Sequence, residues 1–226
     1  GGGPWNRANW ASARLLPAPA ASPEASVRIY AARTGRWKGI FAHHCWIVLK
    51  EKGADAYTRY DKVGWGPPVR TNNWAPDAFW YGHDPELVAV FTGADAEAMI
   101  PRIKAAVRSY PYAGAGAYRA WPGPNSNTFV AHVLSALPKG AGVVLPPTAL
   151  GKDFRDFSHA FGFTPSHTGL QVAFGGLLGV TIGWVEGLEV NILGLVAGID
   201  VRRPALKLPG FGRIGLSPGS SISVSC

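Results

Sequence analysis

Two runs of the sequence contain residue types that could together carry acyl-transfer chemistry. Ser126 lies in a turn-forming run, Pro-Gly-Pro-Asn-Ser-Asn at 122–127, directly before an apolar helical stretch. His44 opens an apolar run typical of a buried strand. A helix N-terminus supplies free N–H groups and the positive end of the dipole, which stabilise a nucleophile and an oxyanion. A histidine held by a strand can act as the base, so the pair predicts a Ser126 nucleophile and a His44 base.

Simpler interpretations of these residues remain open at this point. Asn125 or Ser126 could serve only as the helix N-cap, a position that favours both residue types. His44 could be a hydrogen-bonded core residue. Strand alternation places His44 and Trp46 on one face and the neighbouring His43 and Cys45 on the other. A metal site is disfavoured because spaced ligand pairs are missing, so we expect no metal and no cofactor.

The same two runs resemble a known group of enzymes. Asn-Ser-Asn-Thr-Phe-Val at 125–130 is similar to the Asn-Cys-Glu-His-Phe-Val signature of lecithin-retinol acyltransferase-like proteins, in the circularly permuted branch of the NlpC-type papain-like superfamily. The run at 44–49 resembles the strand that holds their catalytic histidine, and Tyr118 fits their layout. Over most of 27–216 the chain also resembles a bacterial domain family of no assigned function. The resemblance implies a permuted papain-like fold with Ser126 as nucleophile and His44 as base.

The sequence also departs from this pattern at functional positions. Serine stands at position 126 in place of cysteine, and Thr128 stands where the group has histidine. Serine is the weaker nucleophile and depends more on an aligned base. No histidine follows His44 at the spacing of the usual third polar residue, where Tyr57, Arg59, Tyr60 and Asp61 are the nearby substitutes. We therefore expect the supporting residues to be among Asn125, Asn127, Tyr57, Asp61 and Tyr118.

The predicted elements give an α+β domain, permuted papain-like, with an antiparallel sheet packed against two main helices. Period-two alternation predicts strands over 27–30, 41–50, 56–63 and 87–91. Helical spacing of Met99, Ile103, Ala106 and Val107 predicts a helix over 95–110, and a second helix runs from the Ser126 turn to just before Pro138.

Composition divides the chain into three parts. Residues 1–26 form an extended Trp- and Pro-rich arm whose tryptophans we expect to dock, 27–216 form the domain, and 217–226 form a tail. The glycine-rich stretch 169–201 is interpreted as a buried hairpin region around Glu186-Gly187, or alternatively as a membrane-contacting segment. The hairpin is favoured, since the polar residues Glu186, Glu189, Asn191 and Asp200 argue against a spanning helix.

Charge and composition restrict the partners. The chain has 226 residues and a formal net charge of +8. Hydrophobic residues make up 47% of it and charged residues 16%, a composition that excludes wholesale disorder. A basic protein favours anionic partners, but no basic helix, zinc finger or RNA-binding signature points to nucleic acid. The arm, the apolar glycine-rich stretch and the basic C-terminal part, with Arg202, Arg203, Lys207 and Arg213, predict association with a membrane surface or a membrane protein complex.

The expected location is the bacterial cell envelope, periplasmic or membrane-associated. The opening Gly1-Gly2-Gly3, without an initiator Met, suggests a processed or truncated N-terminus. Two hypotheses follow for function. The first is a hydrolase or acyltransferase acting on an acyl, amide or peptide bond. The second is a catalytically silent papain-like module that serves as an accessory subunit of a membrane complex.

Overall fold

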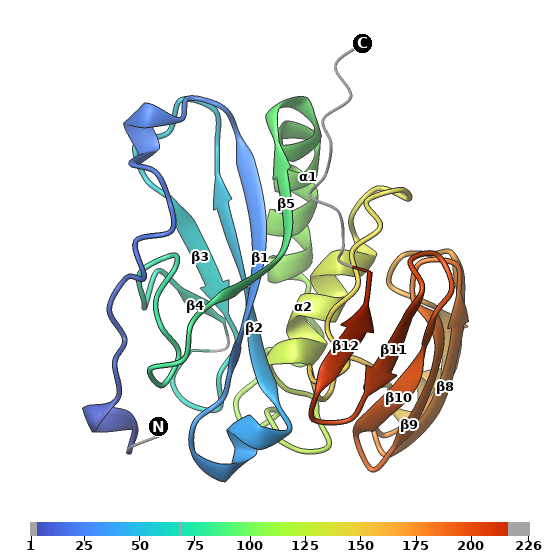
Figure 1. Cartoon of the computed structure of the whole chain (residues 1–226). Coiled ribbons are helices and arrows are strands. Elements are labelled where there is room, and N and C mark those ends of the chain that lie inside the picture. The colour runs from blue at the N-terminus through green and yellow to red at the C-terminus, as the bar shows by residue number, and fades with distance from the viewer. Residues whose placement is uncertain (1–3, 68, 217–226) are drawn as a thin grey trace.

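The computed structural model describes residues 4–67 and 69–216, so the predicted tail at 217–226 lies outside the described residues. The fold is α+β and consists of two antiparallel sheets and two main helices (Figure 1). The first sheet has five strands in the order β4-β3-β2-β1-β5. Its elements are β1 (Ser26–Arg33), β2 (His43–Lys50), β3 (Thr58–Asp61), β4 (Arg70–Thr71) and β5 (Glu86–Thr92), with the helices α1 (Gly93–Arg108) and α2 (Ser126–Ser135). Short 3₁₀ helices cover Trp5–Arg7, Pro19–Ala21, Arg36–Ile40 and Phe157–His159.

The central strand β2 is buried along its whole length because both faces of the first sheet are covered. On one face, Ile47 of β2 and Ile29 of β1 pack with Ile103 of α1 and Phe129 of α2 in the main core. On the other face, Trp46 joins a second cluster with Tyr30, Val48, Val63 and Trp80. The predicted strands and both predicted helices are therefore present, and alternation along β2 assigns its side chains to two different cores.

The N-terminal arm docks on the second of these faces. The Trp10 ring lies 5.0 Å from that of Trp80 in an edge-to-face arrangement. Asp77 fixes the arm through its carboxylate, which accepts hydrogen bonds from the Ser12 hydroxyl at 2.7 Å and from the Leu15 N–H at 2.7 Å. Trp5 takes no part in this packing and is 64% exposed. Only one of the two arm tryptophans is therefore used to hold the arm down.

The glycine-rich region forms more strands than the single hairpin region that the sequence predicted. Seven strands follow one another in the order β12-β11-β10-β9-β8-β7-β6, and each pairs with the next in the chain. They are β6 (Phe161–Phe163), β7 (Gly169–Phe174), β8 (Leu178–Gly183), β9 (Gly187–Ile192), β10 (Leu195–Asp200), β11 (Ala205–Leu208) and β12 (Gly212–Gly215). The predicted turn at Glu186-Gly187 joins β8 to β9, and the basic stretch after Arg202 supplies β11 and β12.

Glycines with positive φ make the repeated reversals of this sheet possible. Gly187 has φ +75°, and a Cβ at this position would lie 2.2 Å from the carbonyl oxygen of Ile199 on β10. Such a contact would force the strands apart, so a side chain cannot be accommodated at this turn. Gly176, Gly194 and Gly210 have φ values of +74°, +86° and +76° near three other reversals. Glycine therefore serves four of the six turns, whereas the connections 164–168 and 201–204 contain none.

The second sheet buries polar side chains toward the rest of the protein. Glu189 on β9 is bridged by Lys207 Nζ at 2.5 Å and by Lys152 Nζ at 2.5 Å. Burial alone would raise the pKa of Glu189, but the two lysines hold it below its usual value. Gln171 and Thr181 share the same interior through a hydrogen bond of 3.0 Å. The acidic residues of the glycine-rich region are thus part of a satisfied buried network.

The helices of the described residues differ from membrane-spanning helices in length and composition. Neither α1, α2 nor any shorter helix in 4–67 and 69–216 combines the length and the apolar character needed to cross a bilayer.

The docking of the arm predicts unequal roles for its tryptophans. Replacing Trp10 by alanine should lower the free energy of unfolding by about 2 kcal/mol, because a partly buried aromatic ring leaves a cavity against Trp80. Replacing the exposed Trp5 by alanine should change it by less than about 0.5 kcal/mol. Urea unfolding of both variants checks this, and a Trp10→Ala variant as stable as the Trp5→Ala variant would contradict the docking role given to Trp10.

Candidate active site

Asn125 caps the helix that carries Ser126. Its side-chain oxygen accepts hydrogen bonds from the backbone N–H groups of Asn127 at 2.9 Å and Thr128 at 3.3 Å. In return, the Thr128 hydroxyl oxygen accepts from the Asn125 N–H at 3.0 Å, which completes a capping box. The cap is therefore Asn125, and Ser126 is the first residue of α2. The Ser126 hydroxyl is therefore not needed to cap the N-terminus of the helix.

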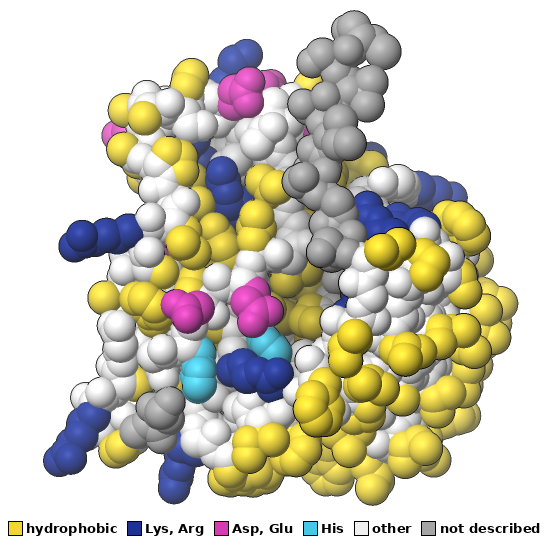
Figure 2. All heavy atoms as spheres, viewed as in Figure 1, with side chains coloured by type: hydrophobic (Ala, Val, Ile, Leu, Met, Phe, Trp, Pro, Cys, Tyr) yellow, Lys and Arg dark blue, Asp and Glu magenta, His cyan; other side chains and the backbone are white. Residues whose placement is uncertain are grey.

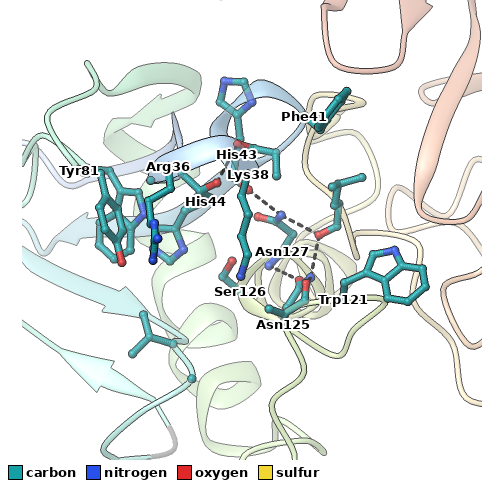
Figure 3. A pocket seen from close by; sticks show the side chains of 18 of the residues that line it. Arg36, Lys38, Phe41, His43, His44, Tyr81, Trp121, Asn125, Ser126 and Asn127 are labelled. Atoms are coloured by element: carbon teal, nitrogen blue, oxygen red, sulfur yellow. Dashed lines mark hydrogen bonds between the residues drawn. The ribbon is translucent and has the colours of Figure 1, made fainter. Parts of the chain in front are cut away.

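Asn127 ties the first turn of α2 to the strand that holds His44. Its amide nitrogen donates to the carbonyl oxygen of His43 at 2.8 Å, and its side-chain oxygen accepts from the Cys45 N–H at 3.0 Å. These backbone groups lie on either side of His44. The hydrogen bonds therefore bring Ser126 and His44 to the same pocket, where Figure 3 draws both side chains.

The segment 148–151 closes this junction from a third direction. The carbonyl oxygen of Leu150 accepts from the side-chain amides of Asn125 at 2.9 Å and Asn127 at 2.8 Å. The Gly151 carbonyl accepts from the Thr128 hydroxyl at 2.7 Å. Gly151 has φ +90°, and a Cβ there would lie 2.3 Å from the Asn125 side-chain nitrogen. Only glycine fits at this position beside the capping box.

His44 is held in one orientation and one tautomer. Its Nε2 lies 2.7 Å from Asp61 Oδ2, and its ring stacks on Trp80 at 3.9 Å with an interplanar angle of 13°. An ionised carboxylate can only accept, so Nε2 carries the hydrogen and Nδ1 keeps its lone pair. Burial lowers the pKa of His44, against a smaller opposing effect of Asp61. At neutral pH the ring is therefore neutral, with Nδ1 available as a base.

The Asp61 carboxylate stays ionised because the positive charge of Arg59 stabilises it inside the protein. The Arg59 guanidinium donates to Oδ1 at 2.6 Å and to Oδ2 at 2.9 Å, and lies over the Trp46 ring at 4.2 Å. Burial alone would raise the pKa of Asp61, but Arg59 and His44 hold it below its usual value. The buried charges of Arg59 and Asp61 thus form a pair that positions the histidine.

Tyr118 lies close to Ser126. Burial raises the pKa of Tyr118 to about 12, and hydrogen bonding with the side chain and backbone of Ser126 acts in the opposite direction. The phenol is therefore protonated at physiological pH and can donate a hydrogen bond. Tyr118 and Ser126 line the same pocket.

The pocket has a volume of about 890 Å³, within the range of small-molecule sites. Aromatic side chains, including Trp37, Trp80 and Trp121, make up much of its wall. Arg36 and Lys38 also line it, whereas no acidic side chain among the described residues does. Figure 3 shows Lys38 extending across the pocket toward Ser126. The pocket therefore combines an apolar wall with positive charge.

The structure brings together most of the predicted site residues but not Tyr57. The Tyr57 hydroxyl donates to the Pro17 carbonyl at 3.0 Å, so this side chain supports the arm at a distance from the pocket. Asp61 takes the position beside His44 instead. Trp80 and Lys38 complete the surroundings without having been selected from the sequence, and Arg59, which the sequence offered only as a nearby substitute, pairs with Asp61. Within the described residues, no three His, Cys, Asp or Glu side chains gather in a manner that could hold a metal ion.

Comparison with known proteins gives one family match. The family model described as "Protein of unknown function (DUF3750)" matches residues 24–154, which is more than half of the chain. No curated protein and no solved structure matches the chain. The matched residues contain the first sheet, both main helices, and His44, Asp61 and Ser126. The match ends before β6, the first strand of the second sheet.

The ion pair at the site predicts a non-additive effect on stability. Asp61→Asn should lower the free energy of unfolding by about 3–5 kcal/mol, because it leaves the Arg59 cation buried without a counter-charge. The double variant Arg59→Met/Asp61→Asn should cost less than Asp61→Asn alone, since no buried charge is then left unpaired.

Urea unfolding in a double-mutant cycle measures these effects. Asp55→Asn is the matched control, because Asp55 is exposed on a loop. An Asp61→Asn variant as stable as the Asp55→Asn control would contradict the role given to the pair.

Proposed function

The chain belongs to the DUF3750 family of proteins of unknown function, and we propose that it is a serine-dependent hydrolase or acyltransferase acting at the cell envelope. In this proposal Ser126 is the nucleophile, His44 the base and Asp61 the residue that orients the base. The bond attacked is an acyl, amide or peptide bond. The observation that carries the proposal is the His44–Asp61 hydrogen bond, because it leaves Nδ1 of a neutral imidazole unprotonated in the pocket of Ser126.

The reaction would proceed through an acyl-serine. As Ser126 Oγ attacks the substrate carbonyl carbon, its proton passes to His44 Nδ1, and Asp61 stabilises the imidazolium that forms. His44 then gives this proton to the leaving group as the tetrahedral intermediate collapses. Attack on the Ser126 ester by water would complete hydrolysis, and attack by an alcohol or amine would complete acyl transfer.

The oxyanion would be stabilised by one donor at the start of α2 and one beside it. Because the capping box uses the N–H groups of Asn127 and Thr128, the Ser126 N–H is the first-turn donor that the cap does not use, and it would exchange its present contact with the Tyr118 oxygen for the oxyanion. The Tyr118 hydroxyl, kept protonated by its raised pKa, is the second candidate donor. Removing one such donor from an oxyanion hole commonly costs about 100- to 1,000-fold in rate. Tyr118 thus has a defined role in the proposal.

A permuted papain-like arrangement is part of the proposal. It is supported by the resemblance of the runs at 44–49 and 125–130, by Ser126 at a helix N-terminus and by His44 on the neighbouring antiparallel strand. Serine in the nucleophile position demands a well-aligned base. The fixed tautomer of His44, its stacking on Trp80 and its bond to Asp61 support a base held in one orientation.

The charge of the pocket favours a substrate with an anionic group beside the reacting acyl carbon. Arg36 and Lys38 would attract such a group, and no described acidic side chain in the pocket opposes them.

The competing function is a catalytically silent module that acts as an accessory subunit of a membrane complex. The exposed apolar surface of the second sheet favours this second candidate, which the following experiment separates from an enzyme.

A fluorophosphonate probe should label the protein at Ser126, because the probe traps an activated serine. Ser126→Ala should abolish the labelling, and His44→Ala should slow it by at least about 100-fold through loss of the base. Ser135→Ala, at the other end of α2, is the matched control and should label normally. Mass spectrometry of the labelled peptide identifies the site. Unchanged labelling of the His44→Ala variant, or none of the native protein, would favour the silent module.

The pH dependence of labelling should report the lowered pKa of His44. The base acts in its neutral form, and an ordinary histidine would be half protonated near its usual value of 6.5. Because burial lowers the pKa of His44, the labelling rate should stay near its maximum at pH 6.5 and fall only at more acidic pH. A rate already half lost at or above that pH would contradict the assignment of His44 as a buried neutral base.

A further inference from the structure

The second sheet exposes apolar side chains and buries polar ones, the reverse of the usual arrangement in a water-soluble sheet. Along β9, Glu189 and Asn191 point inward, whereas Leu188, Val190 and Ile192 are 40%, 40% and 57% exposed. Strands β8 and β10 continue the same face. We call this surface the apolar face and define it by Val180, Ile182, Leu188, Val190, Ile192 and Ile199. Figure 2 shows hydrophobic side chains gathered over this side of the molecule.

The size of the apolar face calls for a partner. Four of the seven strands have six residues and are about 20 Å long, and the other three have three or four residues and are about 10–13 Å long, so at about 4.8 Å between strands the face covers roughly 550 Å². This reaches the upper end of the largest apolar patch on ordinary monomers, and patches of this kind mark protein or membrane contacts.

The edges of the sheet are less available than its face. At the β6 edge, Arg155 donates to the carbonyl oxygens of Phe163 at 2.6 Å and His159 at 3.2 Å. Arg155 thus occupies an acceptor that a strand added beside β6 would need, and both edge strands are short, with three residues in β6 and four in β12. The partner should therefore contact side chains on the face and not the strand edges.

Charge around the face points to an anionic surface. The acidic residues of the region, Glu186, Glu189 and Asp200, are at most 9% exposed. Arg202 and Arg203 lie at the turn between β10 and β11 and remain half-buried at the surface, where the Arg202 guanidinium also donates to the Gly142 carbonyl oxygen at 3.2 Å. Exposed negative charge is thus missing from the described part of this sheet, whereas positive charge is present at its rim. Trp184, 63% exposed between β8 and β9, adds the aromatic residue typical of a lipid–water boundary.

The apolar face also meets the mouth of the Ser126 pocket. Leu193 and Leu195 belong to the turn and strand after β9, and both line the pocket. Trp121 donates through Nε1 to the Leu193 carbonyl at 2.9 Å and is itself 56% exposed. Phe211, at the β11–β12 turn, is 78% exposed. One end of the sheet is therefore continuous with the pocket rim that carries Arg36 and Lys38.

From these observations we propose that the apolar face docks on the surface of a lipid bilayer that contains anionic lipids. The face lies in the interface without crossing the membrane, its aliphatic side chains enter the acyl boundary, and the rim arginines contact headgroups. Of the surfaces first expected from the sequence to contact a membrane, this proposal keeps the glycine-rich region and sets aside the arm and two of the four basic residues. Trp10 is occupied in holding the arm, Lys207 is paired with Glu189, and Arg213 is paired with Asp200.

The docking does not depend on the proposed chemistry at Ser126. If both hold, the pocket opens beside the lipid surface and receives its substrate there.

Vesicle co-sedimentation of the full chain tests the proposal. At about 0.1 M salt, the protein should bind vesicles with about one quarter phosphatidylglycerol at least tenfold more tightly than pure phosphatidylcholine vesicles, and about 0.5 M salt should weaken this binding. Ile182→Glu/Val190→Glu should reduce binding at least tenfold, because two charges enter the middle of the apolar face. The matched control is Leu15→Glu/Leu87→Glu, which places the same charges at leucines 54% and 51% exposed elsewhere.

Further measurements keep the result interpretable. Circular dichroism must show that each variant is folded, and Arg202→Glu/Arg203→Glu gives an independent variant that leaves the face intact and should also weaken binding. Fluorophosphonate labelling in the absence of vesicles should be the same in all these proteins, so a failure of docking is distinct from a failure of the proposed chemistry. No vesicle binding, or equal binding by the face variant and its control, would overturn the proposal. It would also be overturned if the native chain formed a dimer that Ile182→Glu/Val190→Glu dissociated, without binding vesicles.

Discussion

The side-chain amide of Asn127 is the junction on which the site depends. It joins the first turn of α2 to the backbone of β2 on both sides of His44, and it also binds Leu150. A helix packed on a sheet through apolar contacts alone could slide by a fraction of a turn. Hydrogen bonds to specific backbone groups remove that freedom, because a shift would leave buried polar groups unpaired. The relation between Ser126 and His44 therefore rests on polar contacts more than on the core.

Electrostatics within the first sheet then define the protonation state of the site. Arg59, Asp61 and His44 follow one another in a buried chain of hydrogen bonds. The arginine keeps the aspartate ionised, and the ionised aspartate selects the histidine tautomer with hydrogen on Nε2. Because Arg59 also offsets the aspartate charge, burial prevails and the histidine remains neutral. A buried ion pair that adds little stability of its own can thus determine the chemistry of its neighbour.

The two sheets obey opposite rules of burial. The first sheet is covered on both faces, by α1 and α2 on one side and by the arm and Trp80 on the other. The second sheet covers a polar interior around Glu189 and leaves its apolar face to the exterior. The family match ends between them, at residue 154. The matched part thus holds the candidate catalytic residues, while the remainder supplies part of the pocket rim and the surface proposed to meet a membrane.

Local patterns in the sequence were sufficient to identify most of the first sheet and the helix start at Ser126. Alternation along 41–50 assigned His44 and Trp46 to one face, and their rings stack. Alternation could not choose between Tyr57 and Asp61, which fall on the same face of the predicted strand 56–63. The antiparallel register decides, since Ile47 lies opposite Tyr60 and Leu49 opposite Thr58, which brings Asp61 toward the His44 end.

The same limit applies to the glycine-rich region. Its glycines and its alternation indicated strands and turns, but the number of strands was underestimated because the basic stretch after Arg202 lacked a clear period. Alternation places Glu189 and Val190 on opposite faces of the strand, but it does not indicate which face the rest of the protein covers. Lys152, from a distant part of the chain, lies against Glu189 and makes the polar side the inner one. The sequence determined the alternation, and only tertiary packing decided that its apolar side faces outward.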